Sequence, residues 1–364
     1  MADEATNRQA FRIQEFYCRQ MAAPLYADIC VALAEGLDRS SETGRAVLDW
    51  SGEPTRDALP LRLIGGLHAL VLAGVDAELA EIFAGRVSGA ALGKALNRVL
   101  ARNDAAVLPW LEGPPQTNEA GRSGALIVGL IEVARRLGPK LEVLEIGSSG
   151  GLNLLIDRFR FDLGGAMLGP EDSPITIAPE WLGEPPVLPP LEIVSTRGSD
   201  IAPLDVTDPA VEARLSAYVW AEKPERLARL KTAIGMIRAR GVDLARADAA
   251  DWIEARLAEP QAEGVVRVLM HSVVWQYIPD DRTARIRAAM AAAGARATAE
   301  RPLAWVAMEP DRSLGEQVVS IRTWPGPEAR EVVATAHAHA AWVRPGDTRA
   351  TEGIALDEAA QVVL

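Results

Sequence analysis

The pattern of apolar and polar residues divides the chain into a helical first part and a second part in which strands and helices alternate. Up to about residue 139, apolar residues recur every three to four positions, as in amphipathic helices, and no segment has a convincing strand pattern. Helices are expected at 11–21, 24–37, 61–72, 77–83 and 90–101. Proline and glycine interrupt the pattern at 60, 113–115 and 138–139. The last break predicts a helical domain over 1–138 and an α/β domain over 139–364.

The stretch 141–157, LEVLEIGSSGGLNLLID, has the strongest strand pattern of the second part. Its first residues form a nearly continuous apolar run, typical of a strand buried on both faces of a parallel sheet. Glycines at 147, 150 and 151 then permit a tight turn, and the apolar spacing over 152–159 predicts a helix directly after it. Such a unit directs backbone N–H groups and a helix dipole at one place, which suits a small polar or anionic ligand. The alternative is an ordinary turn that uses glycine for packing.

Glu145 interrupts the apolar run near its end. A buried carboxylate is costly unless it lies at the carboxyl edge of the sheet, where it meets a partner or a polar ligand. We therefore expect Glu145 at that edge.

The later segments complete an α/β pattern. Strands are expected at 191–196, 242–245, 265–270 and 303–308, with helices at 211–240 and 281–293. The proline-rich stretch 160–190 is predicted as an insertion that starts with a small hairpin and continues as a surface loop or lid. Alternation on both sides of residues 325–327 predicts a long antiparallel hairpin. The predicted fold is a doubly wound, mostly parallel sheet with a C-terminal antiparallel hairpin, preceded by an all-α domain.

Composition and charge narrow the class of partner. The chain is 49% hydrophobic and 24% charged, as in globular proteins, and its net charge of −12 opposes binding to nucleic acid or anionic lipid. A small-molecule substrate is favoured. Cys18 and Cys30 have no metal-site or disulfide-framework spacing, the N-terminus has no signal-peptide pattern, and the longest apolar run, 63–75, is too short to span a bilayer. We expect a cytoplasmic protein without a membrane segment.

A polar cluster lies just upstream of the glycine turn, in the stretch QTNEAGRSGAL that starts at residue 116. Thr117 or Asn118 could cap the helix that follows. A cap does not explain why Gln116, Glu119 and Arg122 gather there too. We expect this cluster to help close a pocket between the two domains.

The element order resembles the class I S-adenosylmethionine-dependent methyltransferases over roughly residues 139–345. In that family the first strand and turn read acid-x-Gly-x-Gly-x-Gly, and here the corresponding residues are Glu145, Gly147, Ser149 and Gly151. Ser149 replaces the second glycine. The stretches QTNEAGRSGAL, EIGSSGGLNLL and HSVVWQY also resemble, across nearly the whole chain, a bacterial family of unknown function.

The methyltransferase resemblance implies S-adenosylmethionine as cofactor. It assigns cofactor binding to Glu145, Gly147, Ser148, Ser149, Gly151, Asn153, Asp200 and Asp248. In this reading Asp200 accepts the ribose hydroxyls and Asp248 faces the adenine amine. Asp200 could instead be a turn residue before Pro203. The proline-rich insertion puts it about 50 residues past Gly151, whereas related nucleotide folds place the acid about 20 residues on. Asp251 is read as a helix cap.

His271 lies at the end of the predicted strand 265–270 and is the expected general base. Its unperturbed pKa of about 6.5 suits proton removal from the alcohol, acid or amine that would accept the methyl group. The alternative is a histidine bonded to backbone at the sheet edge. The other catalytic candidates are Tyr277 and Glu119, and the substrate-binding candidates are Gln116, Asn118, Arg122 and Gln276. His337 and His339 could join Glu309 or Asp311 at a metal, but local spacing fixes no third ligand and no metal is predicted.

Two other functions compete with methyl transfer. A nicotinamide-dependent oxidoreductase shares the doubly wound topology, but GxGxxG is absent and the terminal hairpin disfavours it. A non-catalytic binding or regulatory protein on a methyltransferase-like scaffold is the other alternative, because Ser149 departs from the glycine pattern.

Overall fold

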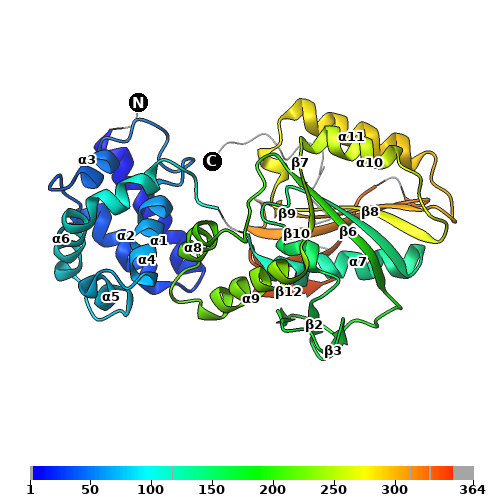
Figure 1. The fold of residues 1–364 in the computed structure, drawn as a ribbon, viewed down its shortest axis with the longest axis horizontal. Helices are drawn as coiled ribbons and strands as arrows, with labels where there is room; N and C mark the ends of the chain where they lie inside the picture. Colours follow the sequence, from blue (N-terminus) through cyan, green and yellow to red (C-terminus); the bar gives the residue numbers. More distant parts are fainter. Residues whose placement is uncertain (1–2, 117, 312, 328, 347–364) are drawn as a thin grey trace. The chain divides into compact units, whose positions relative to one another are not determined.

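The computed structural model describes residues 3–116, 118–311, 313–327 and 329–346, and these form two compact units (Figure 1). Unit 1 contains the chain up to residue 117 and the segment Pro209–Ala228. Unit 2 contains Asn118–Asp208 and the described residues from 229 onward. The chain therefore leaves unit 1, returns to it once, and leaves it again.

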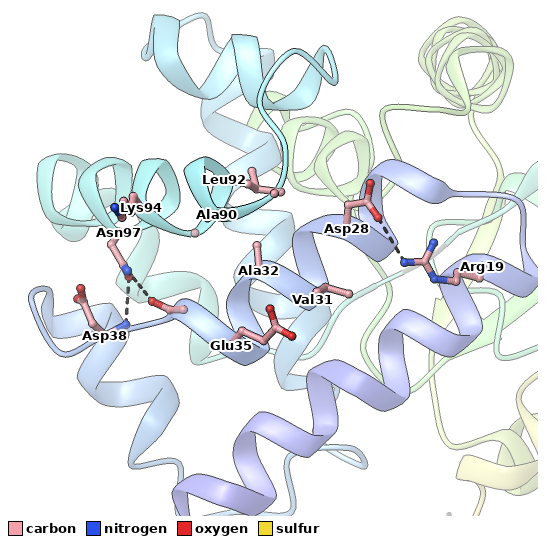
Figure 2. Close-up of a pocket in the computed structure, with 13 residues that line it drawn as sticks. Arg19, Asp28, Val31, Ala32, Glu35, Asp38, Ala90, Leu92, Lys94 and Asn97 are labelled. Carbon is pink, nitrogen blue, oxygen red and sulfur yellow. Dashed lines mark hydrogen bonds and ion pairs between the residues drawn. The ribbon is translucent and has the colours of Figure 1, made fainter.

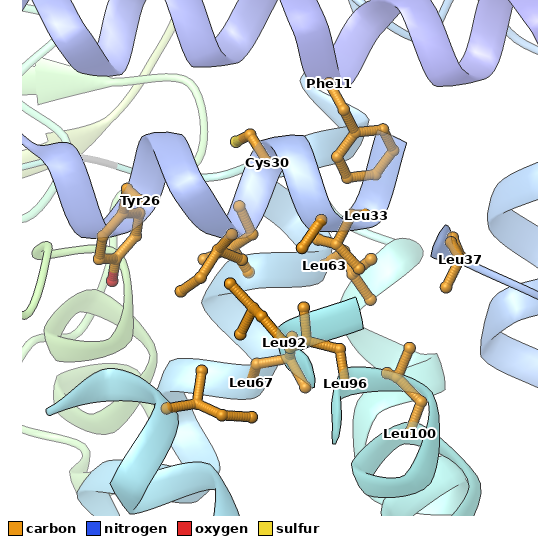
Figure 3. Close-up of a cluster of buried hydrophobic side chains, with 14 of the residues drawn as sticks. Phe11, Tyr26, Cys30, Leu33, Leu37, Leu63, Leu67, Leu92, Leu96 and Leu100 are labelled. Atoms are coloured by element: carbon orange, nitrogen blue, oxygen red, sulfur yellow. The ribbon is translucent and has the colours of Figure 1, made fainter. Parts of the chain in front are cut away.

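The described residues of unit 1 form helices and connecting turns, as the apolar pattern predicts. The helices are α1 (Glu4–Gln20), α2 (Pro24–Gly36), α3 (Glu42–Leu48), α4 (Leu59–Leu72), α5 (Ala77–Phe83), α6 (Ala90–Val107), the 3-10 helix η1 (Leu108–Leu111) and α8 (Pro209–Ala217), followed by the first residues of α9 (Pro224–Arg240). Figure 3 shows leucines of α2, α4 and α6 meeting in one buried cluster. Burial of this apolar face, rather than helix propensity alone, holds the short helices in place.

The returning segment 209–228 is bonded to the N-terminal helices. Glu222 accepts hydrogen bonds from the backbone N–H groups of Leu25 (2.9 Å) and Tyr26 (3.3 Å), which begin α2. Ala23, at the N-cap position of α2, makes no side-chain cap bond. A carboxylate at a helix N-terminus satisfies free N–H groups and complements the helix dipole. The segment thus supplies a cap that the local sequence lacks.

Unit 2 is built on a nine-stranded sheet with the order β5-β12-β11-β10-β9-β8-β1-β6-β7. Its strands are β1 (Lys140–Ile146), β5 (Glu180–Trp181), β6 (Glu192–Asp200), β7 (Asp243–Arg246), β8 (Val265–Ser272), β9 (Leu303–Asp311), β10 (Glu316–Trp324), β11 (Glu331–Ala336) and β12 (Trp342–Pro345). Strands β7, β6, β1, β8 and β9 are parallel, and β9, β10, β11 and β12 pair antiparallel. The predicted α/β class, the parallel core and the antiparallel hairpin β10–β11 are confirmed.

Helices cover both faces of this sheet. Figure 1 shows α10 (Ala249–Ala258) and α11 (Asp280–Gly294) over one face and α7 (Ser123–Leu137) over the other. Eleven of the 15 residues of α7 are buried, and the helix packs against β9, β10 and β11. It therefore belongs to unit 2, so the structure divides the chain before α7 rather than at the predicted residue 138.

The strand order reverses at β1. The chain runs from β1 to β6 and β7 on one side, and then returns to β8 and β9 on the other side of β1. In open parallel sheets such a reversal leaves a crevice at the carboxyl ends of the two central strands, and ligands bind there. In unit 2 these strands are β1 and β8.

The prediction of a helix directly after the glycine turn is wrong. Only the 3-10 helix η3 (Leu152–Leu155) forms, and the chain then enters β2 (Arg160–Leu163) and β3 (Ala166–Leu168), which pair as the predicted small hairpin. Bonds from Arg160 N to Ile175 O and between β2 and β4 (Thr176–Ile177) draw the chain into this small sheet. A helix dipole after Gly151 therefore contributes nothing to the turn. The proline-rich stretch is also not only loop, since β5 adds to the edge of the large sheet beside β12.

No single helix in the described ranges is both long enough and apolar enough to cross a membrane. Helices α4 and α5 meet the criterion together, by length and composition only, with a 115° bend between them.

Candidate functional site

The glycine turn after β1 is tightly bent. Gly147 and Gly151 have φ values of +68° and +78°, and Ser149 between them has +55°. This left-handed region costs a residue with a Cβ roughly 1–2 kcal/mol. Strain of this kind persists only where surrounding contacts impose it, and it clusters at functional sites.

The end of β6 imposes this conformation. Asp200, the last residue of β6, accepts hydrogen bonds from the backbone N–H groups of Ser149 and Ala202, each at 2.8 Å. Ser148 N donates to Ser199 O at 3.0 Å, and Leu204 N donates to Ser149 O at 3.1 Å. Asp200 thus lies at the turn, where a ligand held by the turn could reach its carboxylate.

Glu145 lies at the carboxyl edge of the sheet, as predicted, and is only 1% exposed. Asn153 Nδ2 donates to its Oε1 at 3.1 Å, and Ser123 Oγ donates to Asn153 Oδ1 at 2.9 Å. Its Oε2 is buried and has no hydrogen-bond partner among the described residues. Burial raises the pKa of Glu145 to about 7; the Asn153 bond, the nearby Ser148 hydroxyl and the charge of Arg122 oppose the rise, and the negative charge of Asp200 adds to it. Such a carboxyl group changes charge near neutral pH.

Side chains lie close over the glycines. A Cβ on Gly147 would come within 2.3 Å of Val274 Cγ2, and a Cβ on Gly150 within 2.4 Å of Val206 Cγ1 and 2.8 Å of Asn118 Nδ2. The alternative interpretation, that glycine is used here for packing, therefore accounts for these two residues in this conformation.

The residues of the polar cluster that starts at residue 116 have different surroundings in the structure. Asn118 contacts the turn at Gly150, and its Nδ2 is a second buried atom without a hydrogen-bond partner among the described residues. Arg122 donates from Nε to Ala338 O at 3.1 Å and interacts electrostatically with Glu145. Asn118 and Arg122 are thus brought to the turn. Gln116 belongs to unit 1, so its role stays a prediction.

Glu119 is held in an ion pair instead. Arg229 Nη2 lies 3.1 Å from Glu119 Oε1, which also accepts a bond from Gly121 N at 2.9 Å. These contacts place Glu119 as the cap of the 3-10 helix η2 (Ala120–Arg122). The predicted cap at Asn118 is therefore wrong, and the other cap candidate, Thr117, lies outside the described residues.

His271 is fully buried near the end of β8. Its Nδ1 lies 2.7 Å from Glu309 Oε1, and its ring stacks on Trp275 with centroids 5.1 Å apart. The partner is therefore a carboxylate and not the backbone. Burial lowers the pKa of His271, with the Glu309 carboxylate opposing that effect. His271 Nε2 is buried and has no partner within the described part of the chain.

Two of the residues that follow His271, at positions 276 and 277, lie at the surface. Trp275, Gln276 and Tyr277 form the 3-10 helix η4 (Trp275–Tyr277), in which Gln276 is exposed and Tyr277 is 74% exposed. The buried histidine and the two exposed candidates therefore do not form one cluster. The predicted roles of Gln276 and Tyr277 would require this segment to move.

Asp248 is a helix cap. It follows β7 and accepts bonds from Ala250 N (2.9 Å) and Asp251 N (3.2 Å) at the start of α10. Asp251, predicted as the cap, instead pairs with Arg285 at 2.7 Å. The capping role therefore moves from Asp251 to Asp248.

The histidine pair lies in the connection between β11 and β12. His339 N donates to His337 Nδ1 at 3.1 Å, and the two rings are 5.5 Å apart. Among the residues that the structure describes, no group of three or more His, Cys, Asp or Glu side chains is arranged to hold a metal ion.

Two features of the site have no clear signal in the local sequence. Glu309 is 38 residues from His271 and meets it only because β8 and β9 are neighbours. Val273 has a φ of +51°, which is strained for a β-branched residue, and it directly follows β8, the strand that pairs with β1. A polar residue at the end of the strand next to that of His271 was the available signal for Glu309.

Unit 1 contains a separate hollow of about 690 Å³ between α2 and the start of α6 (Figure 2). Its charged lining residues include both signs, and Figure 2 shows Arg19 and Asp28 paired at one side. The sequence pattern did not indicate it.

The comparisons with known proteins give one match. A family model described as "Uncharacterized protein conserved in bacteria (DUF2332)" matches residues 8–344. No curated protein and no solved structure matches the chain significantly. The match covers both units and all the residues of the site. The chain therefore belongs to this bacterial family, DUF2332, as the three quoted stretches indicated.

Proposed function

We propose that the protein binds S-adenosylmethionine at the carboxyl ends of β1 and β6 and transfers its methyl group to a small molecule. The observation that carries the proposal is the bond from Ser149 N to Asp200 Oδ2, 2.8 Å, at the carboxyl end of β1, one of the two strands that border the reversal of strand order. It puts a carboxylate suited to ribose hydroxyls on the same turn as the backbone N–H groups.

The residues present fit such a ligand in two respects. Glu145 Oε2 and Asn118 Nδ2 are buried polar atoms without partners among the described residues, one an acceptor and one a donor. Buried polar atoms usually have partners, and a bound ligand would supply them. Val206 and Val274 lie over the glycines, so their segments would move on binding.

The chain's own residues would do little covalent chemistry. The bound cofactor would supply an electrophilic methyl group on sulfur. Methyl transfer depends mainly on placing donor and acceptor about 3 Å apart in line, and a dry site supports this. His271 would take the proton of the acceptor at Nε2.

Ligand binding tests the proposal directly. We expect S-adenosylmethionine and S-adenosylhomocysteine to raise the melting temperature of the full chain and to bind in calorimetry, because a ligand of the native state stabilises it by about 2.7 kcal/mol at 100 times Kd. Nicotinamide cofactors should give no shift. Absence of any shift at millimolar ligand would refute the proposal, and a shift with nicotinamide cofactors alone would favour the oxidoreductase.

A matched pair of glycine variants localises the site. Gly147 and Gly165 both have positive φ, but a Cβ overlaps a neighbour only at Gly147; at Gly165 nothing lies within 4 Å. Gly147→Ala should lose binding, and Gly165→Ala should bind as the wild type does. Equal affinities would place the ligand elsewhere.

A second pair tests the carboxylate. Asp200→Asn keeps an acceptor for Ser149 N but removes the charge, and we expect a loss of affinity of about tenfold or more, the range for hydrogen bonds to charged groups. Asp205→Asn is the control, because Asp205 bonds to Thr207 in the same connection. Its affinity should not change.

A non-catalytic binding or regulatory protein is the second candidate. The observation that favours it is the burial of His271, at 0% exposure, together with the side chains over Gly147 and Gly150. Cofactor binding without methyl transfer to any member of an acceptor panel would support this function over the enzyme.

A further inference from the structure

We propose that Glu309 is a positioning residue with two partners: it orients the His271 imidazole so that Nε2 is the proton-accepting atom, and it latches the turn 273–275 over Gly147. The proton-accepting part rests on the proposed methyl transfer, and the latch does not.

One carboxylate oxygen makes all three contacts. Glu309 Oε1 lies 2.7 Å from His271 Nδ1 and accepts bonds from Val274 N at 3.1 Å and Trp275 N at 3.3 Å. An ionised carboxylate only accepts hydrogen bonds, so the proton of a neutral imidazole lies on Nδ1 and the lone pair on Nε2. Glu309 therefore selects the tautomer.

The same contacts close the turn. Val274, held by its N–H, is the residue whose side chain lies over Gly147, and Trp275 stacks on His271. Val273 at the start of this turn has a φ of +51°, a conformation that neighbouring contacts must maintain. Releasing the Glu309 bonds would thus relax a strained segment and uncover both Gly147 and His271.

Around His271 and Glu309, several buried donor and acceptor atoms have no hydrogen-bond partner among the described residues. His271 Nε2, Glu309 Oε2 and Trp305 Nε1 are buried without partners among the described residues. The charged groups around the imidazole are Glu309 on β9 and Arg330, whose guanidinium lies 4.5 Å from the Trp305 ring centroid; Arg287 of α11 lies over Trp275. A substrate O–H or N–H would meet the lone pair at Nε2. Its proton would move to Nε2, the electron pair of the broken bond would stay on the acceptor atom, and the Glu309 carboxylate would balance the imidazolium.

The tautomer is measured in the full chain without ligand, by NMR of protein labelled with 15N-histidine. The chain has four histidines, so single His→Gln variants assign the signals. We expect His271 to be neutral with its proton on Nδ1 at pH 7. Glu309→Gln, which retains an acceptor, should keep this tautomer and lower the pKa of His271. Glu309→Leu should shift the proton toward Nε2.

The matched control is Asp311→Asn. Asp311 lies two residues further along β9, and its carboxylate also accepts backbone N–H bonds, from Ser313 and Leu314. The Asp311→Asn variant should leave the NMR signals of His271 unchanged. A wild-type proton on Nε2, or identical His271 signals in wild type and Glu309→Leu, would overturn the orienting role.

The latch has its own readout. In Glu309→Leu we expect faster amide exchange at 273–277 and 147–150, and at least tenfold faster carbethoxylation of His271 by diethyl pyrocarbonate. His68, buried in unit 1, is the internal reference and should not change. Unchanged exchange and labelling would overturn the latch.

These results are separable from the proposed function. If the wild type fails to bind S-adenosylmethionine but the NMR and labelling results hold, the methyltransferase is wrong and the latch stands. If binding holds and Glu309→Leu behaves as the wild type, the latch is wrong and the cofactor site stands.

Discussion

Strands β1 and β8 lie side by side, and each has ionisable residues at both ends. The two ends differ in whether the polar atoms of these residues have hydrogen-bond partners. Near the amino ends, Arg267 and Glu142 are paired at 3.0 Å, and Arg267 is only 3% exposed. Near the carboxyl ends, Glu145 and His271 are buried just as deeply, and each has a polar atom without a partner among the described residues.

At the amino ends, every nitrogen of the Arg267 guanidinium has a partner. Arg267 donates through Nε to Glu142 and through both Nη atoms to the backbone carbonyls of residues 256, 259 and 260. The other oxygen of Glu142 accepts from Arg197 at 2.6 Å. Buried charges with every partner in place are structural, because their desolvation is offset by bonds the protein itself supplies.

The carboxyl ends instead combine strain with unmet polar atoms. Ser149 and Val273 have φ values of +55° and +51°, on the turns that follow β1 and β8. A fold that can satisfy buried charge at one end of its strands has no physical need to leave it unsatisfied at the other. The difference supports our proposal that the carboxyl ends hold a ligand, at a cost in stability.

The largest expected effect is at the amino ends. Arg267→Met should lower the free energy of unfolding by about 3–5 kcal/mol, because it removes one of the two guanidinium partners of Glu142 and the donor to three backbone carbonyls. Denaturant unfolding measures this. Arg301→Met removes an exposed pair with Glu263 and should cost about 1 kcal/mol or less. Similar losses for both variants would contradict the claim that the Arg267 network at the amino ends stabilises the fold more than an exposed ion pair does.

Glu145→Gln should act in the opposite direction. Folding raises the pKa of Glu145 from 4.5 to about 7, so this carboxyl is protonated in both states below pH 4.5 and must ionise in a buried place as the pH rises through 7. The variant avoids this penalty. We expect it to be more stable than the wild type by about 3 kcal/mol at pH 8, with the gain vanishing toward pH 4.5.

The control for Glu145→Gln is Glu142→Gln on the same strand. It weakens the bonds to Arg197 and Arg267 and should be destabilising at pH 8. If both variants lose stability at pH 8, the ionised Glu145 carboxylate stabilises the fold as Glu142 does, and the proposed difference between the two ends is wrong.

Acid should weaken the folded state through the buried histidines. Burial lowers the pKa of His68 and of His271, so the unfolded chain binds more protons once the pH falls through about 6.5. Stability is therefore present above this pH and lost below it, with a slope of at most about 1.4 kcal/mol per pH unit for each histidine. His271→Gln should reduce the slope measured by chemical denaturation between pH 7 and 5. His339→Gln, at a half-buried position, should leave it closer to the wild type.

The smallest expected effect is the relief of strain. Ser149→Gly should raise the free energy of unfolding by about 1 kcal/mol, because glycine adopts positive φ without a Cβ penalty. Ala202→Gly, at a residue without positive φ two positions after Asp200, should lower it by up to about 1 kcal/mol. Thermal unfolding would resolve the two signs, and a loss of stability in both would mean that Ser149 is not strained.

Much of the fold could be predicted because it follows from local periodicity. The spacing of leucines in α4 and α6, the apolar run of β1 and the alternation around residues 325–327 each predicted an element that the structure contains. Glu145 at the sheet edge and Asp200 at a strand end were predicted for the same reason, since strand ends are local signals.

The errors fall where a long-range contact overrides a local pattern. Apolar spacing predicted a helix after Gly151, but pairing of β2 with β3 and β4 formed a small sheet there instead. Asp248 and Asp251 are both suited to capping, and only the path from β7 into α10 decides between them. Tyr277 follows His271 closely in the chain yet lies at the surface, because η4 turns it outward.

The sequence by itself determined the two kinds of architecture, the glycine turn and the residues at the ends of β1 and β6, because periodicity and turn chemistry depend on neighbours in the chain. Only the tertiary structure decided that Glu222 caps α2 from 196 and 197 residues away, and that Glu309 meets His271. The physical reason is that a hydrogen bond between distant residues depends on which strands become neighbours and how helices pack. Those choices minimise the free energy of the whole chain, and the residues near either partner do not specify them.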